Sequence, residues 1–335
     1  MFISEPTIDD LLHRVLEVLL RRGRAILPAK GPAVELIGVL IELRNPRARL
    51  SRTEARSLLF GGLGEFLWYL AGSDSYEFIR HYIPNYPVTP DRMGRVPSAY
   101  GPRLINEGEG RNQIENVISM MLNNRDSRRA VIQIFDANDV LDHDSDVPCT
   151  CTMQFLLRGK LLHMFVNMRS NDAFVGLPSD LFAFTMIQEV VARSIGAEVG
   201  RYKHCVGSLH LYDKDRSKAE DYLEERWQSN IAMPPMPLGD PWPDVHEVLA
   251  AEERIRNGSL RAVPKSISSP YWADIVNLLR IFERSFKGDN KAVGRFRRRM
   301  STDVFDVYID KRRRCALKVA SSPSVQPQRE LFKPH

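Results

Sequence analysis

The reactive side chains of this sequence are concentrated between residues 146 and 180. Two short apolar runs, 152–157 and 161–166, flank a Gly-containing turn and predict a β-hairpin. Five nucleophilic, basic and acidic side chains lie within 32 positions around this hairpin: Cys149, Arg169, Ser170, Asp172 and Asp180. A thiol can attack a substrate, arginine and serine can bind an anion, and carboxyl groups can move protons, so this density indicates chemistry.

Two cysteines compete for the role of nucleophile. Cys149 follows a proline, and Cys151 lies two positions later, so both would point to the same face of an extended segment. Periodicity alone leaves both open, and an inert buried thiol is the commoner fate of a cysteine. With Cys205 and Cys315 the chain has four cysteines without paired CxxC spacing. Neither a zinc knuckle nor a disulfide framework is favoured, and no metal is expected.

Helices and strands must position these residues. Apolar spacing predicts helices over 7–22, 51–72, 111–123 and 178–196, and strands over 34–43 and 204–212. Thr7 or Asp9 is expected to cap the first helix, and Ser51 or Thr53 the second. Residues 73–110, rich in Pro, Gly and Tyr, are expected to form a long functional loop.

Several polar residues of these elements have two possible roles. Glu65 lies among apolar residues of its helix; it is a proton donor with a raised pKa if it faces the core, or a surface glutamate. Tyr82, Tyr86 and Tyr100 could stack on a flat ligand or pack internally.

Two pairs of polar residues are tied to strands. Arg128 and Arg129 precede a β-branched strand; adjacent guanidiniums suit a phosphate, and a surface pair is the alternative. His210 and Tyr212 share one face of a strand and could hold a sugar hydroxyl, although a lone histidine usually has a structural role.

Composition restricts the class of protein. With 335 residues, 43% of them hydrophobic, the chain can form one large domain or one domain with an appendage. No run approaches the roughly 18 apolar residues of a membrane span, and the acidic N-terminus is unlike a signal peptide, so a cytoplasmic protein is expected. The net charge of +5 is concentrated in RFRRR at 295–299 and KRRRC at 311–315. Without interleaved aromatics, these runs favour a solvated surface over nucleic-acid binding.

Six separated motifs carry a resemblance to a known family. They are GEFLWYLAG at 64–72, AYG at 99–101, DSRR at 126–129, PC at 148–149 with Gln154, RSND and GLP within 169–178, and HLY at 210–212. In this order they resemble the thymidylate synthase superfamily over about residues 10–220. The resemblance implies an α/β (α+β) fold, a large mixed sheet with flanking helices, and a homodimer formed by packing two sheets together.

The resemblance also implies roles in catalysis. Cys149, favoured over Cys151 by the preceding proline and the spacing to Gln154, resembles the nucleophile that adds to C6 of a pyrimidine nucleotide. Carbon C5 then attacks the methylene group of 5,10-methylenetetrahydrofolate. Glu65 resembles the glutamate that organises water and proton transfer, and Asp172 the acid beside the folate pterin.

Further residues match the nucleotide-binding positions of the family. Phosphate contacts are implied for Arg21, Arg169 and Ser170 of one protomer. Arg128 and Arg129 resemble the pair that reaches the partner's site, so dimerisation would be needed for activity. Contacts with the sugar 3′-hydroxyl are implied for His210 and Tyr212, and Tyr100 is expected near the site.

Departures from the family pattern indicate the substrate. Thymidylate synthases have GLPFN, whose asparagine contacts uracil, whereas this chain has GLPSD ending in Asp180. A carboxylate pairs well with cytosine protonated at N3, and the exchange resembles the cytidylate 5-hydroxymethylases of the superfamily. The base is therefore predicted to be cytosine. Asn171 could contact or crowd the sugar 2′ position, and CMP and dCMP both remain possible.

Other departures concern the product. Thr150 replaces the histidine usual after the nucleophile, and Ser208 replaces an aspartate in the motif before His210. No synthase-type C-terminal segment is recognisable, so water could capture the methylene intermediate and give a hydroxymethyl product. Two rivals stay open: a reductive methylase, and a non-catalytic relative that binds nucleotide or RNA. Cys149, Glu65 and Asp180 argue against the second.

Three regions are expected along the chain. Residues 1–225 would form the catalytic core, 226–320 a mainly helical extension packed on the core, and 321–335 a disordered tail.

Overall fold

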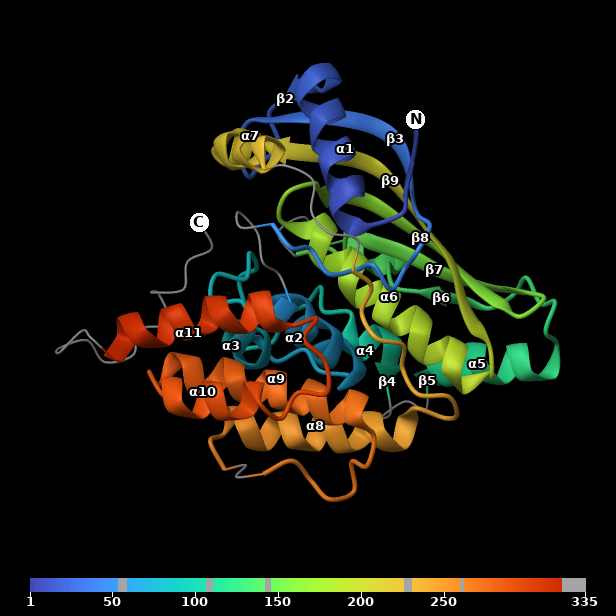
Figure 1. The fold of residues 1–335 in the computed structure, drawn as a ribbon. Helices are drawn as coiled ribbons and strands as arrows, with labels where there is room; N and C mark the ends of the chain where they lie inside the picture. Colours follow the sequence, from blue (N-terminus) through green and yellow to red (C-terminus); the bar gives the residue numbers. More distant parts are fainter. Residues whose placement is uncertain (54–58, 107–110, 142–145, 226–230, 260–261, 321–335) are drawn as a thin grey trace.

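A mixed sheet dominates the computed structural model, which describes residues 1–335 except 54–58, 107–110, 142–145, 226–230, 260–261 and 321–335. Its strands are β1 (Phe2–Glu5), β2 (Arg24–Ile26), β3 (Ala33–Leu43), β6 (Val131–Gln133), β7 (Thr150–Arg158), β8 (Leu161–Asp172) and β9 (Glu198–Tyr212). Within the described residues these seven strands have the order β1-β3-β9-β8-β7-β6, with β2 beside β3 (Figure 1). The short strands β4 (Ile105–Asn106) and β5 (Arg111–Asn112) pair separately. The predicted mixed sheet is confirmed.

The predicted hairpin is present and longer than expected. Strands β7 and β8 pair in antiparallel register across a turn in which Gly159 has a φ of 60°. Strand β8 continues as far as Asp172 and runs parallel to β9. The residues from 169 to 172 therefore lie in a strand. Residues 170–172 pair with β9, and the Arg169 backbone donates to the Cys149 carbonyl on the other side.

Two helices cover one face of the sheet. Helix α1 (Ile8–Arg22) begins after Thr7, whose side chain accepts a hydrogen bond from the Asp10 backbone at 3.2 Å, as predicted. Helix α6 (Gly176–Ser194) begins two residues before the predicted start. Helix α1 packs on β1, β3 and β9, and α6 packs on β8 and β9 (Figure 1). Alternate strand residues such as Val39 of β3 and Val166 of β8 are fully buried.

The opposite face of the sheet is more exposed. On it, Leu156, His163 and Phe165 are half-buried, and Ile37 of β3 is 78% exposed. A half-apolar face of this kind is suited to covering by another protein surface.

The region between β3 and β6 is more helical than the sequence suggested. Helix α2 (Leu59–Leu70) ends as predicted near Gly72, while residues 54–58, at its predicted start, lie outside the described residues. The prediction of one long loop over 73–110 is wrong in part, because α3 (Tyr76–Tyr82) and α4 (Gly101–Leu104) lie within it. The Ser75 side chain caps α3, a signal that the surrounding prolines and glycines obscured. Helix α5 (Gln113–Asn123) completes this region. A 3-10 turn (Ala137–Val140) follows β6, and a second 3-10 turn (Asp213–Asp215) and α7 (Arg216–Glu224) follow β9.

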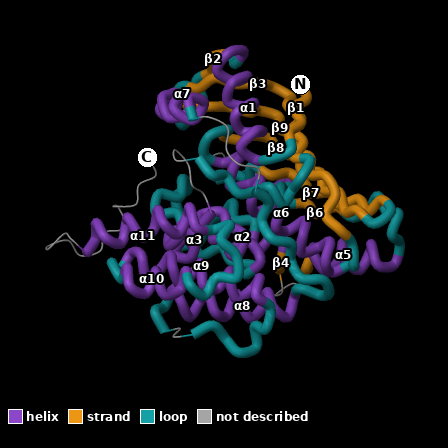
Figure 2. The backbone as a smooth tube through the Cα atoms, in the orientation of Figure 1, coloured by secondary structure: helices purple, strands orange, loops and turns teal. Residues whose placement is uncertain are grey.

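Four helices follow the sheet and pack beside α2 and α3. They are α8 (Trp242–Arg256), α9 (Pro270–Phe286), α10 (Asn290–Arg297) and α11 (Asp306–Ala320). Figure 2 shows that they lie away from the strands of the large mixed sheet. The Tyr82 hydroxyl donates to Glu252 at 2.9 Å, and the Phe60 and Phe282 rings lie 5.3 Å apart. The division into core, extension and tail stays a prediction, and residues 321–335 lie outside the described residues.

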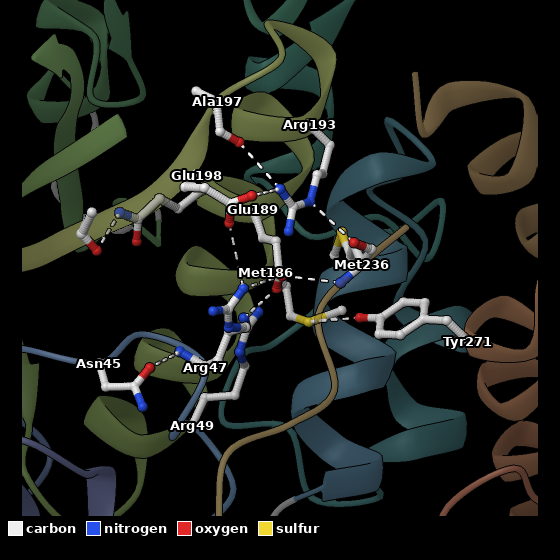
Figure 3. A network of polar contacts seen from close by, with 12 residues as sticks. Asn45, Arg47, Arg49, Met186, Glu189, Arg193, Ala197, Glu198, Met236 and Tyr271 are labelled. Carbon is white, nitrogen blue, oxygen red and sulfur yellow. Dashed lines mark hydrogen bonds and ion pairs between the residues drawn. The ribbon is translucent and has the colours of Figure 1, made fainter. Parts of the chain in front are cut away.

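A buried carboxylate connects distant parts of the chain. Glu189 of α6 is fully buried and pairs with Arg49, which is 1% exposed (Figure 3). Its second oxygen accepts a hydrogen bond from the Met236 backbone at 3.1 Å. The Met236 carbonyl in turn accepts from Arg193 at 3.0 Å, and Arg193 also pairs with Glu198 at 2.8 Å. These ionised groups thus hold the segment before α8 against α6, because leaving one of them buried without its partner would destabilise the fold.

None of the described helices is both long and apolar enough to cross a membrane.

Candidate active site

Cys149 lies directly before β7 and is held by Arg169 of β8. The Arg169 backbone donates to the Cys149 carbonyl at 2.9 Å, and its guanidinium donates to the carbonyls of Pro148 at 2.9 Å and Val147 at 2.7 Å. The arginine remains exposed. The Arg169 side chain therefore holds the backbone that precedes Cys149 and also presents a positive charge to solvent beside the thiol.

The Cys149 thiol is half-buried, and its pKa depends on burial and on several nearby charges. Burial is the largest effect and raises the pKa, and the negative charge of Asp180 raises it further. The positive charges of Arg169 and Lys30 lower it. The resting thiol is therefore mainly protonated at neutral pH and needs a proton acceptor during attack. These charges also place Asp180, some 31 positions along the chain, in the neighbourhood of the thiol.

Asp180 lies in the second turn of α6 and is half-buried, so its carboxyl keeps one accessible side. Burial raises its pKa to about 7, and a hydrogen bond of 2.7 Å from the Asn171 amide opposes the rise. At neutral pH this carboxyl is close to half protonated, so it can accept or donate a hydrogen bond.

Aromatic side chains form a wall beside these groups. Tyr100 lies 5.2 Å from the Tyr69 ring and 6.2 Å from the Phe184 ring, and its hydroxyl accepts from the Thr150 backbone at 3.2 Å. Burial and then Asp180 raise the pKa of Tyr100, which confirms that the two lie near each other. This contact places Tyr100 one residue from Cys149.

Glu65 is on the buried side of α2, with 6% of its surface exposed. The alternative of a surface glutamate is therefore wrong. After burial itself, its charge is the largest cause of the raised pKa values of Tyr69 and Tyr86. Since Asp180 contributes to both of these pKa values too, Glu65 and Asp180 lie around the same tyrosines.

Parallel pairing of β8 and β9 gathers a second polar group. Ser170 and His210 face each other with Oγ and Nδ1 3.4 Å apart, and the His210 and Tyr212 rings meet edge to face at 4.9 Å. Asp172 pairs with His210 in the register and raises the pKa of Tyr212 after burial. Cys149 also contributes to that pKa, so this group adjoins the thiol.

Three predicted phosphate-binding arginines are exposed and are not placed beside Cys149 by any contact described above. Arg21 is exposed in the last turn of α1, and Arg128 and Arg129 are exposed before β6, with no ion pair to either of the latter two among the described residues. Their predicted phosphate roles stay predictions. Cys151 lies at a β-bulge between Thr150 and Thr152, which interrupts the alternation that the sequence argument assumed.

Sequence reasoning missed residues that line or support the site. Tyr69 and Phe184 form the aromatic wall, and Lys30 acts on the thiol from the turn between β2 and β3. Helical spacing of Tyr69 four positions after Glu65 could have revealed the first. The described residues contain no group of three His, Cys, Asp or Glu arranged to hold a metal.

Covalent catalysis by a cysteine, next to a cationic surface and an aromatic wall, is the chemistry that this arrangement supports. A family model described as thymidylate synthase matches residues 51–246, more than half of the chain. The chain belongs to the thymidylate synthase family. The match ends within α8, beyond the predicted core boundary at residue 225.

Curated relatives agree with this assignment. A deoxyuridylate hydroxymethyltransferase of Bacillus phage SP01 is 28% identical over 266 residues, 75% of this chain and 68% of that protein. A deoxyuridylate hydroxymethyltransferase of Delftia phage PhiW-14 is 28% identical over 58% of this chain and 57% of its own length. A thymidylate synthase of Buchnera aphidicola is 28% identical over 48% of this chain and 63% of its own length.

The family determines the general reaction. Its members use methylenetetrahydrofolate as one-carbon donor and modify C5 of a pyrimidine nucleotide. The predicted resemblance, the one-carbon transferase class and the folate co-substrate are thus confirmed.

Proposed function

We propose that this enzyme hydroxymethylates C5 of a cytosine nucleotide, CMP or dCMP. The observation that carries the proposal is the Asp180 carboxyl, which is half-buried near Cys149 and Tyr100. In the thymidylate synthases that this chain resembles, the same position carries an asparagine amide. An amide offers a fixed donor and a fixed acceptor, whereas a carboxyl can share a proton with its partner.

Cytosine suits such a carboxyl. Its N4 amino group donates to one carboxyl oxygen, while one proton lies between the other oxygen and N3. The pair can be written as carboxylate with protonated cytosine or as neutral acid with neutral cytosine, because the proton count is the same. The pKa of about 7 makes the neutral acid accessible at physiological pH.

The same pKa supports a second candidate. A neutral Asp180 can also donate to O4 of uracil and accept from its N3–H. Two relatives are deoxyuridylate hydroxymethyltransferases, so dUMP is the alternative substrate.

The remaining residues have defined tasks in the proposed reaction. Cys149 adds to C6, and Glu65 handles protons at the base. Arg169 and Ser170 bind the phosphate with Arg21 and with Arg128 and Arg129 of the partner protomer. The sugar hydroxyl is bound by His210 and Tyr212. Support for this assignment comes from the proximity of Ser170, His210, Tyr212 and Cys149 described above.

Asp172 fits the folate co-substrate. One of its oxygens accepts the backbone N–H groups of Phe174 at 2.8 Å and Val175 at 2.9 Å. Within the described chain Asp172 makes no further hydrogen bond, so its second oxygen is available to an N–H group of a pterin. When bound, methylenetetrahydrofolate supplies a one-carbon unit to C5. Loss of the C5 proton and departure of tetrahydrofolate leave a methylene group on C5, and water adds to its carbon. The bond between Cys149 and C6 then breaks, which restores the C5=C6 double bond and gives the hydroxymethyl product.

Mass spectrometry of the products tests the proposal directly. Purified enzyme is incubated with methylenetetrahydrofolate and equal amounts of CMP, dCMP, UMP and dUMP, with Cys149→Ser as the inactive control. A gain of about 30 mass units, CH2O, on a cytosine nucleotide is expected. A gain of about 14 mass units, CH2, would identify a methylase, and modification of dUMP alone would refute the assignment of cytosine.

A further inference from the structure

A buried chain of polar groups extends behind Asp180, away from the site. The Asn171 amide nitrogen lies 2.7 Å from Asp180 Oδ2 and 3.4 Å from His204 Nε2. His204 Nδ1 lies 2.7 Å from the Tyr202 hydroxyl. Asn171 is 3% exposed, and His204 and Tyr202 are fully buried. These contacts therefore join α6 to one residue of β8 and two residues of β9, adjacent strands in Figure 1.

The direction of these hydrogen bonds is determined by the chemistry of the groups. Burial lowers the pKa of His204 to about 3, so its ring is neutral and carries one N–H. With the Asn171 amide donating to Nε2, that N–H is on Nδ1 and points to Tyr202. Because an amide NH2 can only donate, Asp180 Oδ2 must be an acceptor. Any proton on the carboxyl is then on Oδ1.

Close packing keeps this arrangement in place. A Cβ atom at Gly176 would lie 3.3 Å from Asn171 Oδ1 and 3.7 Å from Asp180 Oδ2. The Asn171 nitrogen also lies 2.8 Å from the Met168 sulfur. With a glycine at the first position of α6, the helix can approach β8 closely enough for the pair to form.

We propose that Asn171 is a positioning residue for base recognition: it orients Asp180 and determines which carboxyl oxygen carries the proton shared with the base. The inference rests on the proposed function only in that Asp180 contacts the base. It assigns Asn171 a contact different from the sugar 2′ contact predicted from sequence, and that earlier contact stays a prediction.

Binding of nucleotide then requires a protonated pair. The complex with cytosine contains one proton more than carboxylate and neutral cytosine together, so binding weakens as the pH rises above the pKa of Asp180. Without the Asn171 hydrogen bond, which favours the ionised carboxyl, that pKa would be higher and the loss of binding would begin at higher pH. The titratable groups around Asp180 on neighbouring elements are Cys149, Glu65, Tyr69, Tyr86, Tyr100, Asp172, Tyr202 and His204.

Calorimetric dissociation constants for dCMP, measured from pH 6 to 10, test the proposal. All proteins carry Cys149→Ser, so thiol ionisation does not contribute. Asn171→Ala is expected to move the alkaline loss of affinity upward by about one pH unit, a tenfold difference on the alkaline side. The isosteric Asn171→Asp, which places a second carboxyl beside Asp180, is expected to move it further.

A matched control separates positioning from packing. Gln188→Leu removes a second buried amide, this one on α6, which donates to the Leu162 carbonyl at 2.9 Å. This variant should lower thermal stability without moving the pH profile. Equal pH profiles for Asn171→Ala and the parent, with only a uniform loss of affinity, would overturn the proposal.

The same experiment distinguishes failure of the proposed function. If dUMP binds and dCMP does not, cytosine is the wrong base. The profile is then measured with dUMP, whose pairing also needs a protonated Asp180, and a shift on Asn171→Ala would still support positioning.

Discussion

Replacing Asp180 by asparagine removes a carboxyl group whose pKa the protein raises from 3.8 to about 7. In the unfolded chain this group ionises above about pH 4, whereas in the folded protein it stays neutral until about pH 7. Folding therefore takes up a proton between these values, and the stability that the neutral form provides is lost as the pH rises through this window. Above pH 7 the full cost is present.

The size of the effect follows from the pKa change. A rise of about three pKa units corresponds to about 4 kcal/mol, and the accessible side of the carboxyl reduces this to about 2 kcal/mol through solvent screening. For a chain of 335 residues, about 2 kcal/mol corresponds to about 3 °C in Tm. Asp180→Asn should thus raise Tm by about 3 °C at pH 8 and leave it unchanged at pH 4.

Thermal unfolding of both proteins between pH 4 and 9 measures this difference. Asp126→Asn, at an exposed position of the turn before β6, is the matched control for the removal of a carboxyl group. A constant Tm difference for Asp180→Asn across the whole range would refute the raised pKa. The same variant should lose activity on cytosine nucleotides and gain it on dUMP, because an amide matches N3–H and O4 of uracil.

Further variants test the other assignments. Cys149→Ser should abolish turnover while Cys151→Ser remains active, and the reverse result in the product assay would identify Cys151 as the nucleophile. An equal mixture of Cys149→Ser and the double variant Arg128→Ala, Arg129→Ala should recover about a quarter of wild-type activity, because a mixed dimer contains one complete site; no recovery would mean that these arginines do not cross the interface. Glu189→Ala should lower the free energy of unfolding by about 3–5 kcal/mol in urea, and a loss below about 1 kcal/mol would show that its ion pairs are not desolvated.

Local patterns predicted much of the fold. The helix over 7–22 and the strands on either side of Gly159 follow from apolar spacing, a cap and a turn residue, all of which act within a few positions. The loop prediction for 73–110 failed because α3 is stabilised by burying Phe78 and Ile79 against the rest of the protein. Such burial depends on distant segments and leaves little local trace.

The candidate site shows the same limit. Motif order named Cys149, Asp180 and His210, and the structure brings residues of these motifs together. The contact between Asn171 and Asp180 could not be predicted, because it depends on how closely α6 approaches β8. The raised pKa of Asp180 likewise results from surroundings contributed by several separate segments.

The buried pair of Glu189 and Arg49 also affects how this chain can be shortened. Ending the protein at residue 225 would remove Met236, whose backbone N–H donates to Glu189 and whose carbonyl accepts from Arg193. Such a truncated protein would keep every proposed catalytic residue and still lose a support beneath α6, the helix that carries Asp180. A minimal catalytic fragment should therefore retain residues through at least 236.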